Sequence, residues 1–416
     1  MHINQQRLLT RFLDYVRVET TADPQSDSYP SSPGQLTLGA ILVEQLQALT
    51  LSDAHQDSNG LVWATIPATV PGPTPTILLN AHLDTSPDAS GANVQPQVIS
   101  NYQGGDIVLP KAGQTIRVAD TPELKDLIGK TLITTDGSTL LGSDDKAGIA
   151  IIMELAAHLI ENPQLPHGPV RILFTCDEEI GAGTRMVDMT HTQNAVVGYT
   201  IDGGGTGVVD GETFSADQAT VRFTGKVTHP SVGKGKMVSA IRAASFFIDN
   251  LPRQELAPEV TDGRQGFLHP HQLEGTVAEA TVKILLRDFD THNLAVYADR
   301  IRQLLSLTER EFPGLTTAVE IQPQYRNMAD GLKHQPLAID LAVQAYEKLH
   351  RPFKVDIIRG GTDGSQFTEK GLPTPNLASG QHNIHSPLEF ACLEEMVEAI
   401  EHLVVLLDLW QQHGRS

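Results

Sequence analysis

A short apolar run that ends in acidic or histidine residues recurs along this chain, and it constrains the fold more than any other feature. The three examples are residues 76–79 before His82 and Asp84, residues 170–174 before residues 177–179, and residues 196–201 before Asp202. Continuous apolar runs of this length are typical of buried, parallel strands. In open α/β sheets the ligand crevice lies at the carboxyl ends of the strands. The pattern therefore predicts an α/β fold with polar residues gathered at one edge of its sheet.

The pattern of elements changes twice along the chain, which predicts two domains. Apolar residues at helical spacing mark residues 146–160, so strands and helices alternate in the first half of the chain. Near residue 214 an α+β pattern begins, and α/β alternation resumes after residue 325. A chain of 416 residues is also too long for one ordinary core. We expect a discontinuous domain of residues 1–213 and 326–416, with residues 214–325 inserted as a second domain.

Further elements are expected from periodicity on both sides of the insertion. The predicted helices are residues 4–18, 37–49, 238–250, 293–312, 337–349 and 393–407, and the predicted strands are residues 61–66, 221–223, 277–287, 317–322, 354–358 and 374–377.

Composition restricts the partners and the compartment. The formal charge of −20 disfavours nucleic acid and anionic membranes as partners. No apolar run approaches the length needed to cross a membrane, and the N-terminal residues lack the apolar core of a signal peptide. Cys176 and Cys392 are the only cysteines, which argues against a disulfide framework and for a reducing compartment. We therefore expect a cytoplasmic protein.

Four acidic or histidine clusters and one late histidine carry the candidate chemistry. They are His82 with Asp84, Asp144 with Asp145, residues 177–179, Asp202, and His385. Carboxylates that meet in one crevice repel one another unless cations compensate. Imidazole and carboxylate ligands without thiolate suit zinc, with cobalt or manganese as possible substitutes. The clusters therefore predict a divalent-metal site.

Spacing within the clusters suggests separate roles. Residues two apart on an extended segment point to the same side, so Asp84 can accept a hydrogen bond from His82 and fix its tautomer. The adjacent Glu178 and Glu179 point apart, so one can bind metal while the other holds a nucleophilic water. Each cluster alone has a plainer explanation, namely a hydrogen-bonded pair, a helix cap, a solvated turn or a loop. Their occurrence in order, most of them after predicted strands, favours the metal site.

Six motifs resemble those of the peptidase T branch of the di-zinc metallopeptidases, the wider family of glutamate carboxypeptidase and aminoacylase. The motifs are residues 80–88 (NAHLDTSPD), 140–148 (LLGSDDKAG), 177–181 (DEEIG), 202–205 (DGGG), 286–290 (LRDFD) and 359–364 (RGGTDG). The resemblance extends from the first predicted helix to the end of the chain. It implies a metal-dependent aminopeptidase that releases the N-terminal residue of short peptides, most of all tripeptides. It also implies a ferredoxin-like inserted domain that acts as a lid and in dimerisation.

The resemblance also implies a set of metal ligands for two Zn²⁺ per subunit. His82 and Asp202 would bind one ion, Glu179 and His385 the other, and Asp144 would bridge them. Glu178 would be the general base and Asp84 the partner of His82, and the Asp144–Asp145 peptide bond would be cis. From the residues alone either His382 or His385 could be the late ligand; the Asn-x-His pattern of the family selects His385.

Three residues of the candidate substrate cleft follow from the resemblance. His229 matches a histidine that reaches the reacting carbonyl, in dimeric relatives from the neighbouring subunit, although a loop histidine is the ordinary alternative. Arg287 could hold the peptide carboxylate or pair with a nearby aspartate, and Arg359 could line the cleft. The resemblance implies a homodimer. Alternative functions are a di-zinc carboxypeptidase, an N-acyl amino acid hydrolase, or a non-catalytic metal-dependent peptide-binding protein.

Overall fold

A computed structural model describes residues 2–111 and 113–414, which divide into two compact units. The first unit comprises Met1–Gly211, Asp330–Asp356 and Thr362–Ser416, and the second comprises Glu212–Ala329 and Ile357–Gly361. The sequence placed the inserted segment at residues 214–325. The second unit also includes Ile357–Gly361, because the amide of Phe214 donates to the carbonyl of Ile358.

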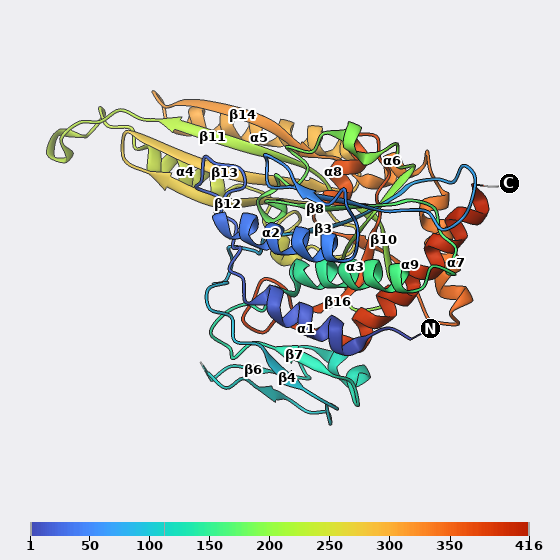
Figure 1. Ribbon diagram of the computed structural model, residues 1–416. Helices are drawn as coiled ribbons and strands as arrows, with labels where there is room; N and C mark the ends of the chain where they lie inside the picture. The colour runs from blue at the N-terminus through green and yellow to red at the C-terminus, as the bar shows by residue number, and fades with distance from the viewer. Residues whose placement is uncertain (1, 112, 415–416) are drawn as a thin grey trace. The chain divides into compact units, whose positions relative to one another are not determined.

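The first unit is built on one large mixed sheet (Figure 1). Its main path follows the strand order β1-β2-β8-β3-β9-β16-β17-β7-β4, and β10 pairs with β16. The strands are β1 His55–Gln56, β2 Val62–Ile66, β3 Ile77–His82, β4 Gln97–Ile99, β7 Leu132–Thr134, β8 Val170–Thr175, β9 Val197–Gly204, β10 Val208–Thr213, β15 Lys354–Ile358, β16 Asn376–His382 and β17 Phe390–Cys392.

The centre of this sheet is parallel, as the apolar runs predicted. β3 pairs in parallel with β8 on one side and with β9 on the other, and β9 pairs in parallel with β16. Every residue of β3 and β8 is buried. The α/β fold class is confirmed by this architecture.

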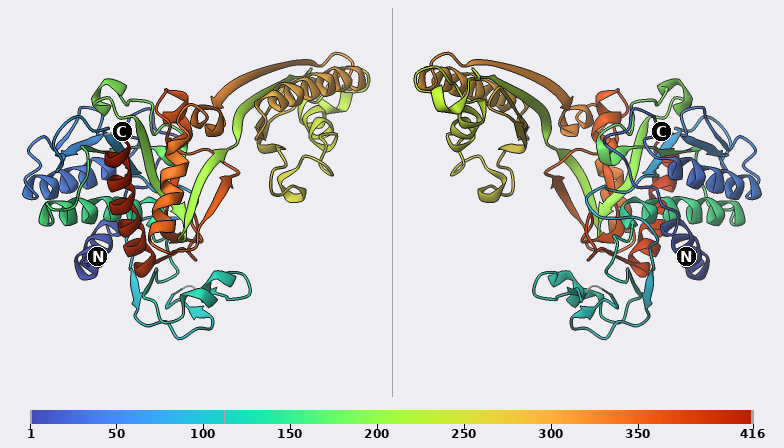
Figure 2. Two further views of the ribbon diagram at one scale, coloured as in Figure 1. Left: turned by 90° about the vertical axis from the view of Figure 1, so that its right-hand side faces the viewer. Right: turned by 90° about the vertical axis from the view of Figure 1, so that its left-hand side faces the viewer.

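Helices of the first unit cover the sheet. α1 packs against α3, α3 against α9, and α9 against α7 (Figure 2). α3 contacts the sheet at β3, β9 and β16, and α9 contacts it at β16. α2 packs on β2, and α8 contacts β9. The helices of the unit are α1 Gln5–Val16, α2 Pro33–Ala48, α3 Ser143–Glu161, α7 Leu337–Lys348, α8 Asp363–Glu369 and α9 Leu393–His413. α6 spans Met328–Leu332, across the border of the two units.

Between β4 and β7 the chain forms a small excursion that the sequence analysis did not predict. It contains β5 Ile107–Val108, paired with β6 Thr115–Ile116, and the short 3₁₀ helix Pro122–Leu127. A separate apolar cluster fills it, and Phe390 and Cys392 of β17 complete that cluster. The excursion is therefore anchored to the edge of the main sheet.

The second unit has the βαββαβ order of a ferredoxin-like module, as the resemblance implied. Its antiparallel sheet has the strand order β12-β13-β11-β14. The elements are β11 Ser215–Thr224, α4 Ala240–Asp249, β12 Phe267–Gly275, β13 Glu279–Asp288, α5 Thr291–Glu311 and β14 Thr316–Tyr325. Phe223, Phe247, Val282 and Ile301 are fully buried where the two helices meet the sheet.

Among the described residues, no helix combines the length and the apolar character that a membrane crossing requires.

A buried ionic contact joins helix α1 to helix α3. The fully buried Glu154 carboxylate accepts hydrogen bonds from Arg7 Nε at 2.7 Å and from Arg11 Nη1 at 2.9 Å. Both arginines are themselves mostly buried, with side chains 27% and 12% exposed. Removing the central carboxylate deprives the mostly buried Arg11 of its carboxylate partner and leaves Arg7 paired with Glu161.

We therefore expect Glu154→Gln to lower the free energy of unfolding of the first unit by about 3 kcal/mol, the lower end for breaking a buried ionic contact. Both tryptophans of the chain, Trp63 and Trp410, belong to the first unit, so urea unfolding followed by tryptophan fluorescence measures it directly. A change below about 1 kcal/mol, typical of an exposed pair, would show that this contact does not hold the two helices together.

Candidate metal centre

The parallel strands bring the predicted site residues to one edge of the sheet. His82 ends β3, and Glu178 and Glu179 follow the end of β8. The register pairs His82 with Thr175 on one side and Asn80 with Thr200 on the other, which sets Asp202 of β9 level with His82. Asp144 lies at the start of α3, and His385 lies in the loop between β16 and β17.

The Asp144 carboxylate lies between the two histidines. Its Oδ1 is 3.0 Å from His82 Nε2, and its Oδ2 is 3.2 Å from His385 Nε2. Asp144 is 7% exposed and His82 is 1% exposed, whereas the side chain of His385 is 37% exposed, so the arrangement is shielded on the His82 side and reached by solvent at His385. One carboxylate with an oxygen directed at each imidazole is the geometry of a bridging ligand.

Two further carboxylates complete the cluster. Glu179 Oε2 is 3.0 Å from His385 Nε2, and Asp202 Oδ1 is 3.9 Å from His82 Nε2. The buried Glu179 Oε1 has no hydrogen-bond partner among the described residues. Donor atoms of His82, Asp144 and Glu179 lie within 4.8 Å of one another. The five predicted ligands therefore lie together, and the unpaired buried Oε1 of Glu179 is an oxygen that a bound cation could satisfy.

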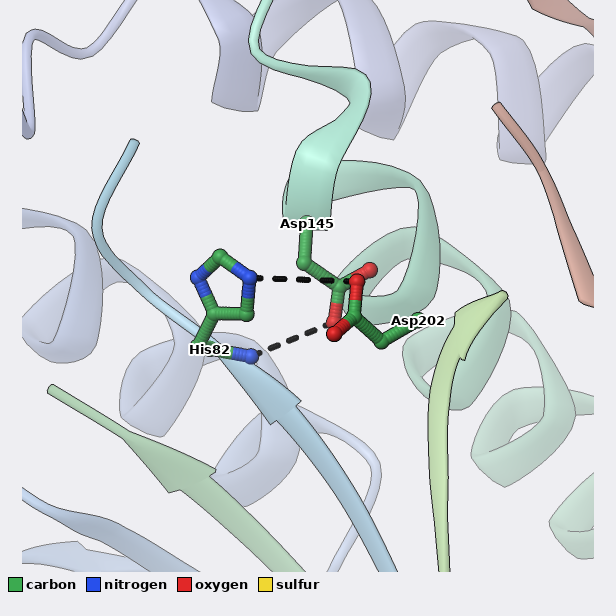
Figure 3. Close-up of side chains that lie close together, drawn as sticks. All are labelled: His82, Asp145 and Asp202. Carbon is green, nitrogen blue, oxygen red and sulfur yellow. Dashed lines mark hydrogen bonds and ion pairs between the residues drawn. The ribbon is translucent and has the colours of Figure 1, made fainter. Parts of the chain in front are cut away.

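Asp145 also lies beside His82 and Asp202, which the sequence analysis did not anticipate (Figure 3). Its two oxygens, however, accept backbone hydrogen bonds from His82 at 3.3 Å and from Gly148 at 3.1 Å. Asp145 thus fastens the end of β3 to the first turn of α3. Because its oxygens are occupied in this way, Asp144 remains the better candidate for the shared ligand. The peptide bond between the two aspartates is cis, as the resemblance implied.

Asp84 holds both the histidine and the acidic turn. Its oxygens accept the backbone N–H groups of Glu178 and Glu179, each at 3.0 Å. His82 Nδ1, the ring nitrogen that does not face the cluster, forms its hydrogen bond with the backbone carbonyl of Asp84 at 3.2 Å, and Oδ1 of Asp84 lies 3.4 Å from the same nitrogen. Both oxygens of Asp84 favour the tautomer that leaves Nε2 free to bind a cation.

Asp88 makes the corresponding contact with the second histidine. Its Oδ2 is 3.2 Å from His385 Nδ1, again the nitrogen that faces away from the cluster. Sequence analysis assigned no role to Asp88, although it stands in the same motif as His82 and Asp84. The contact joins residues 297 positions apart, so only the fold reveals it.

The electrostatics of the cluster favour added positive charge. Burial raises the pKa of Glu178 and of Asp202 well above their ordinary values. Burial and the nearby Asp144 carboxylate raise the pKa of Glu179 to about 7. Burial opposes a charge on His385, but hydrogen bonds to Asp144 and Glu179 outweigh it and raise the pKa of the ring to about 11. These raised pKa values favour the protonated forms of the groups, and divalent cations can supply positive charge in place of the protons.

The donor chemistry fits zinc. Two imidazole nitrogens and three carboxylates face the cluster, while both cysteines are buried and free. Nitrogen and oxygen ligands are used by zinc in catalytic sites, which also keep a position for water.

Other predicted residues lie elsewhere. His382 Nε2 is 2.7 Å from Glu395 Oε2, and its ring stacks on Phe390 at 4.6 Å between centroids. It is therefore occupied outside the cluster, in agreement with the choice of His385.

His229, Arg287 and Arg359 belong to the second unit. His229 is in contact with Ser231, with Nδ1 2.7 Å from Oγ. Arg287 donates to the carbonyl of Asp217 at 3.0 Å and to Gln324 at 2.8 Å. Arg359 donates to the carbonyls of Gly263 and Gln265, each at 2.8 Å. The guanidinium groups of Arg287 and Arg359 thus form hydrogen bonds within the second unit. Their role in substrate binding is a hypothesis.

Comparison with known proteins identifies the class. The sequence profile of peptidase family M20/M25/M40 matches residues 136–408, and the chain belongs to this family.

Within the family, the similarity to peptidase T extends over nearly the whole chain. The chain is 41% identical over 409 residues to peptidase T of Geobacillus sp. (strain WCH70), covering 98% of this chain and 99% of that protein. It is 40% identical over 401 residues to peptidase T of Bacillus subtilis (strain 168), covering 96% and 97%. The resemblance found in the sequence motifs is confirmed by these relatives.

Solved structures share the fold. A tripeptidase from Staphylococcus aureus superposes with a TM-score of 0.77 at 23% identity, covering 99% of each chain. Aminopeptidase PepT from Bacillus cereus ATCC 10987 gives a TM-score of 0.74 at 24% identity, covering 98% of this chain and 99% of that chain.

Proposed function

We propose that this protein is a metal-dependent aminopeptidase that releases the N-terminal residue of short peptides, tripeptides foremost. The observation that carries the proposal is the Asp144 carboxylate between His82 and His385, next to an acidic turn that bears Glu178. Sequence identity of 40–42% over nearly the full length to proteins named peptidase T supports the choice of substrate class.

The proposed centre holds two zinc ions per subunit, with cobalt or manganese as substitutes. His82 and Asp202 would hold one ion, Glu179 and His385 the other, and Asp144 both. Bound zinc polarises a scissile carbonyl and lowers the pKa of water towards 7. The short contacts of Asp144 with both imidazoles, and the unpaired Oε1 of Glu179, support this assignment.

Glu178 is the proposed general base. Its carboxylate would take a proton from the attacking water and return it to the leaving amine nitrogen. Asp84 would hold Glu178 in place through its backbone N–H and hold His82 in the correct tautomer. Because Glu179 faces His385, the two adjacent glutamates would divide the tasks of base and ligand.

Three residues of the second unit are proposed to act on the substrate. His229 would stabilise the oxyanion, from the neighbouring subunit of a homodimer, and Arg287 and Arg359 would contribute to peptide binding. These roles rest on the motifs that resemble peptidase T. We also propose that the protein works in the cytoplasm, consistent with two free, buried cysteines.

The choice of peptide end provides the first test. With zinc present, the protein should release the N-terminal residue of a free tripeptide, and N-acetylation of the same tripeptide should abolish release. Mass spectrometry of the products identifies the bond that is cut. Loss of the C-terminal residue would indicate a carboxypeptidase, cleavage of the acetyl group an N-acyl amino acid hydrolase, and binding without cleavage a peptide-binding protein.

Glu178→Gln should separate chemistry from metal binding. The amide cannot accept a proton, so we expect kcat to fall by about 10²–10⁴-fold while zinc content stays at the wild-type level. Asp144→Ala should instead lose zinc, since it removes the carboxylate between the two histidines. Elemental analysis and peptide turnover on the same samples distinguish the cases, and near-normal turnover by Glu178→Gln would require a different base.

His229 is tested by subunit mixing. Homodimers of Glu178→Gln and of His229→Ala should each be nearly inactive. If His229 acts in the neighbouring site, mixed dimers carry one complete site, and random pairing restores about a quarter of wild-type activity. Activity that stays at parental levels, with mixed dimers confirmed by native mass spectrometry, would exclude action across subunits.

A further inference from the structure

One buried carboxylate outside the ligand set makes an unusual number of contacts near the centre. Glu389 is 1% exposed and precedes β17. Its Oε2 accepts the backbone N–H groups of Leu141 at 2.7 Å and Gly142 at 2.9 Å. Its Oε1 accepts the hydroxyl of Ser143 at 2.6 Å and the backbone N–H of Asp144 at 3.1 Å. A single side chain therefore binds four consecutive residues, the last of which is the shared ligand candidate.

The turn that Glu389 binds is irregular, and one helical hydrogen bond spans it, from the amide of Lys146 to the carbonyl of Gly142 at 3.2 Å. Gly142 has a left-handed φ of +80°, and Asp144 and Asp145 have non-helical backbone angles ahead of the regular part of α3. The amides at this end of a helix lack carbonyl partners within the helix and need acceptors from elsewhere. Glu389 supplies an acceptor to the amides of Leu141 and Gly142, just ahead of the helix, and to that of Asp144 in its first turn, so it defines the path along which the chain delivers the Asp144 side chain.

Glu389 also belongs to the loop that carries His385. Its backbone N–H donates to the carbonyl of Ser386 at 3.1 Å, and the Ser386 hydroxyl donates to the carbonyl of Asn383 at 2.8 Å. These local bonds make the segment from Asn383 to Glu389 one compact turn. The carboxylate therefore joins the His385 loop to the Asp144 turn, although the two lie more than 240 residues apart in sequence.

We propose that Glu389 is a positioning residue of the metal centre. By fixing the Asp144 turn to the His385 loop, it sets the separation of Asp144 and His385 and so the geometry offered to the cations. The inference rests on the proposed function, because it assumes that Asp144 and His385 bind metal. The carboxylate itself need not touch a cation or the substrate.

The test measures zinc affinity without turnover. Metal-free Glu389→Gln should bind Zn²⁺ about 10–100-fold more weakly than wild type in a competition titration with a chromophoric chelator, as is typical for partners that orient metal ligands. The amide retains one acceptor oxygen but directs an NH₂ group at donors. The absorption spectrum of the Co²⁺ form should also change, because the ligand geometry is altered.

Glu154→Gln is the matched control. It makes the same substitution at another buried carboxylate of the first unit, which binds Arg7 and Arg11. This variant should be less stable than wild type yet bind Zn²⁺ within about threefold of it, since its contacts are with α1. If Glu389→Gln also bound Zn²⁺ within threefold of wild type, with an unchanged Co²⁺ spectrum, Glu389 would have only a structural role and the inference would be wrong.

A milder variant covers the case in which Glu389→Gln does not fold. Ser143→Ala removes one donor to Glu389 Oε1 and should weaken Zn²⁺ binding severalfold; unchanged affinity there would overturn the inference. Wild-type protein that binds no Zn²⁺ would instead contradict the proposed function itself. The two failures are therefore distinguishable.

Discussion

Parallel pairing of β3 with both β8 and β9 determines where the chemistry of this chain can occur. In a parallel sheet the carboxyl ends of all strands lie at the same edge. The residues that follow each strand are therefore brought together even though they do not attract one another. The apolar cores of β3 and β8 are fully buried, and their burial supplies the free energy that holds this edge in place. A shift of β3 by one residue would turn His82 to the opposite face of the sheet.

This arrangement concentrates charge that the protein must balance. The largely buried Asp144, Glu179 and Asp202 lie around two imidazoles, of which His82 is buried and His385 is partly exposed. Raised pKa values of Glu179 and His385 express the same imbalance, since protons remain where no cation is present. The hydrophobic sheet therefore imposes an electrostatic requirement on its own edge, which divalent cations would satisfy.

The sequence predicted those parts of the fold that are marked by a pattern within a short stretch of residues. Continuous apolar runs identified the central strands, and helical spacing identified α3 and α9. The strand β12 was missed because Pro270 interrupts it beside a register shift, and because it is an edge strand with many exposed residues. The excursion between β4 and β7 was missed because its two strands, β5 and β6, are only two residues long each.

The candidate site shows the same division. His82, Asp144, Glu179, Asp202 and His385 were selected from clusters and motifs, and the fold brings them together. Asp88 and Glu389 could not be found in this way. Their roles depend on contacts with residues more than 240 positions away, and a lone acidic residue carries no local signal of such a contact.

The carboxylates outside the proposed ligand set have a common physical role. Asp84 accepts backbone N–H groups of the acidic turn, Asp145 accepts that of His82, and Glu389 accepts those of the Asp144 turn. A charged acceptor with two oxygens can bind several backbone donors at once, with stronger bonds than a neutral amide makes. These bonds hold the backbone of the segments that carry the proposed ligands. The ligand side chains can therefore move little except by changing their own rotamers. A dinuclear centre needs such precision, since a bridging carboxylate serves both ions only if each histidine is held at a fixed distance from it.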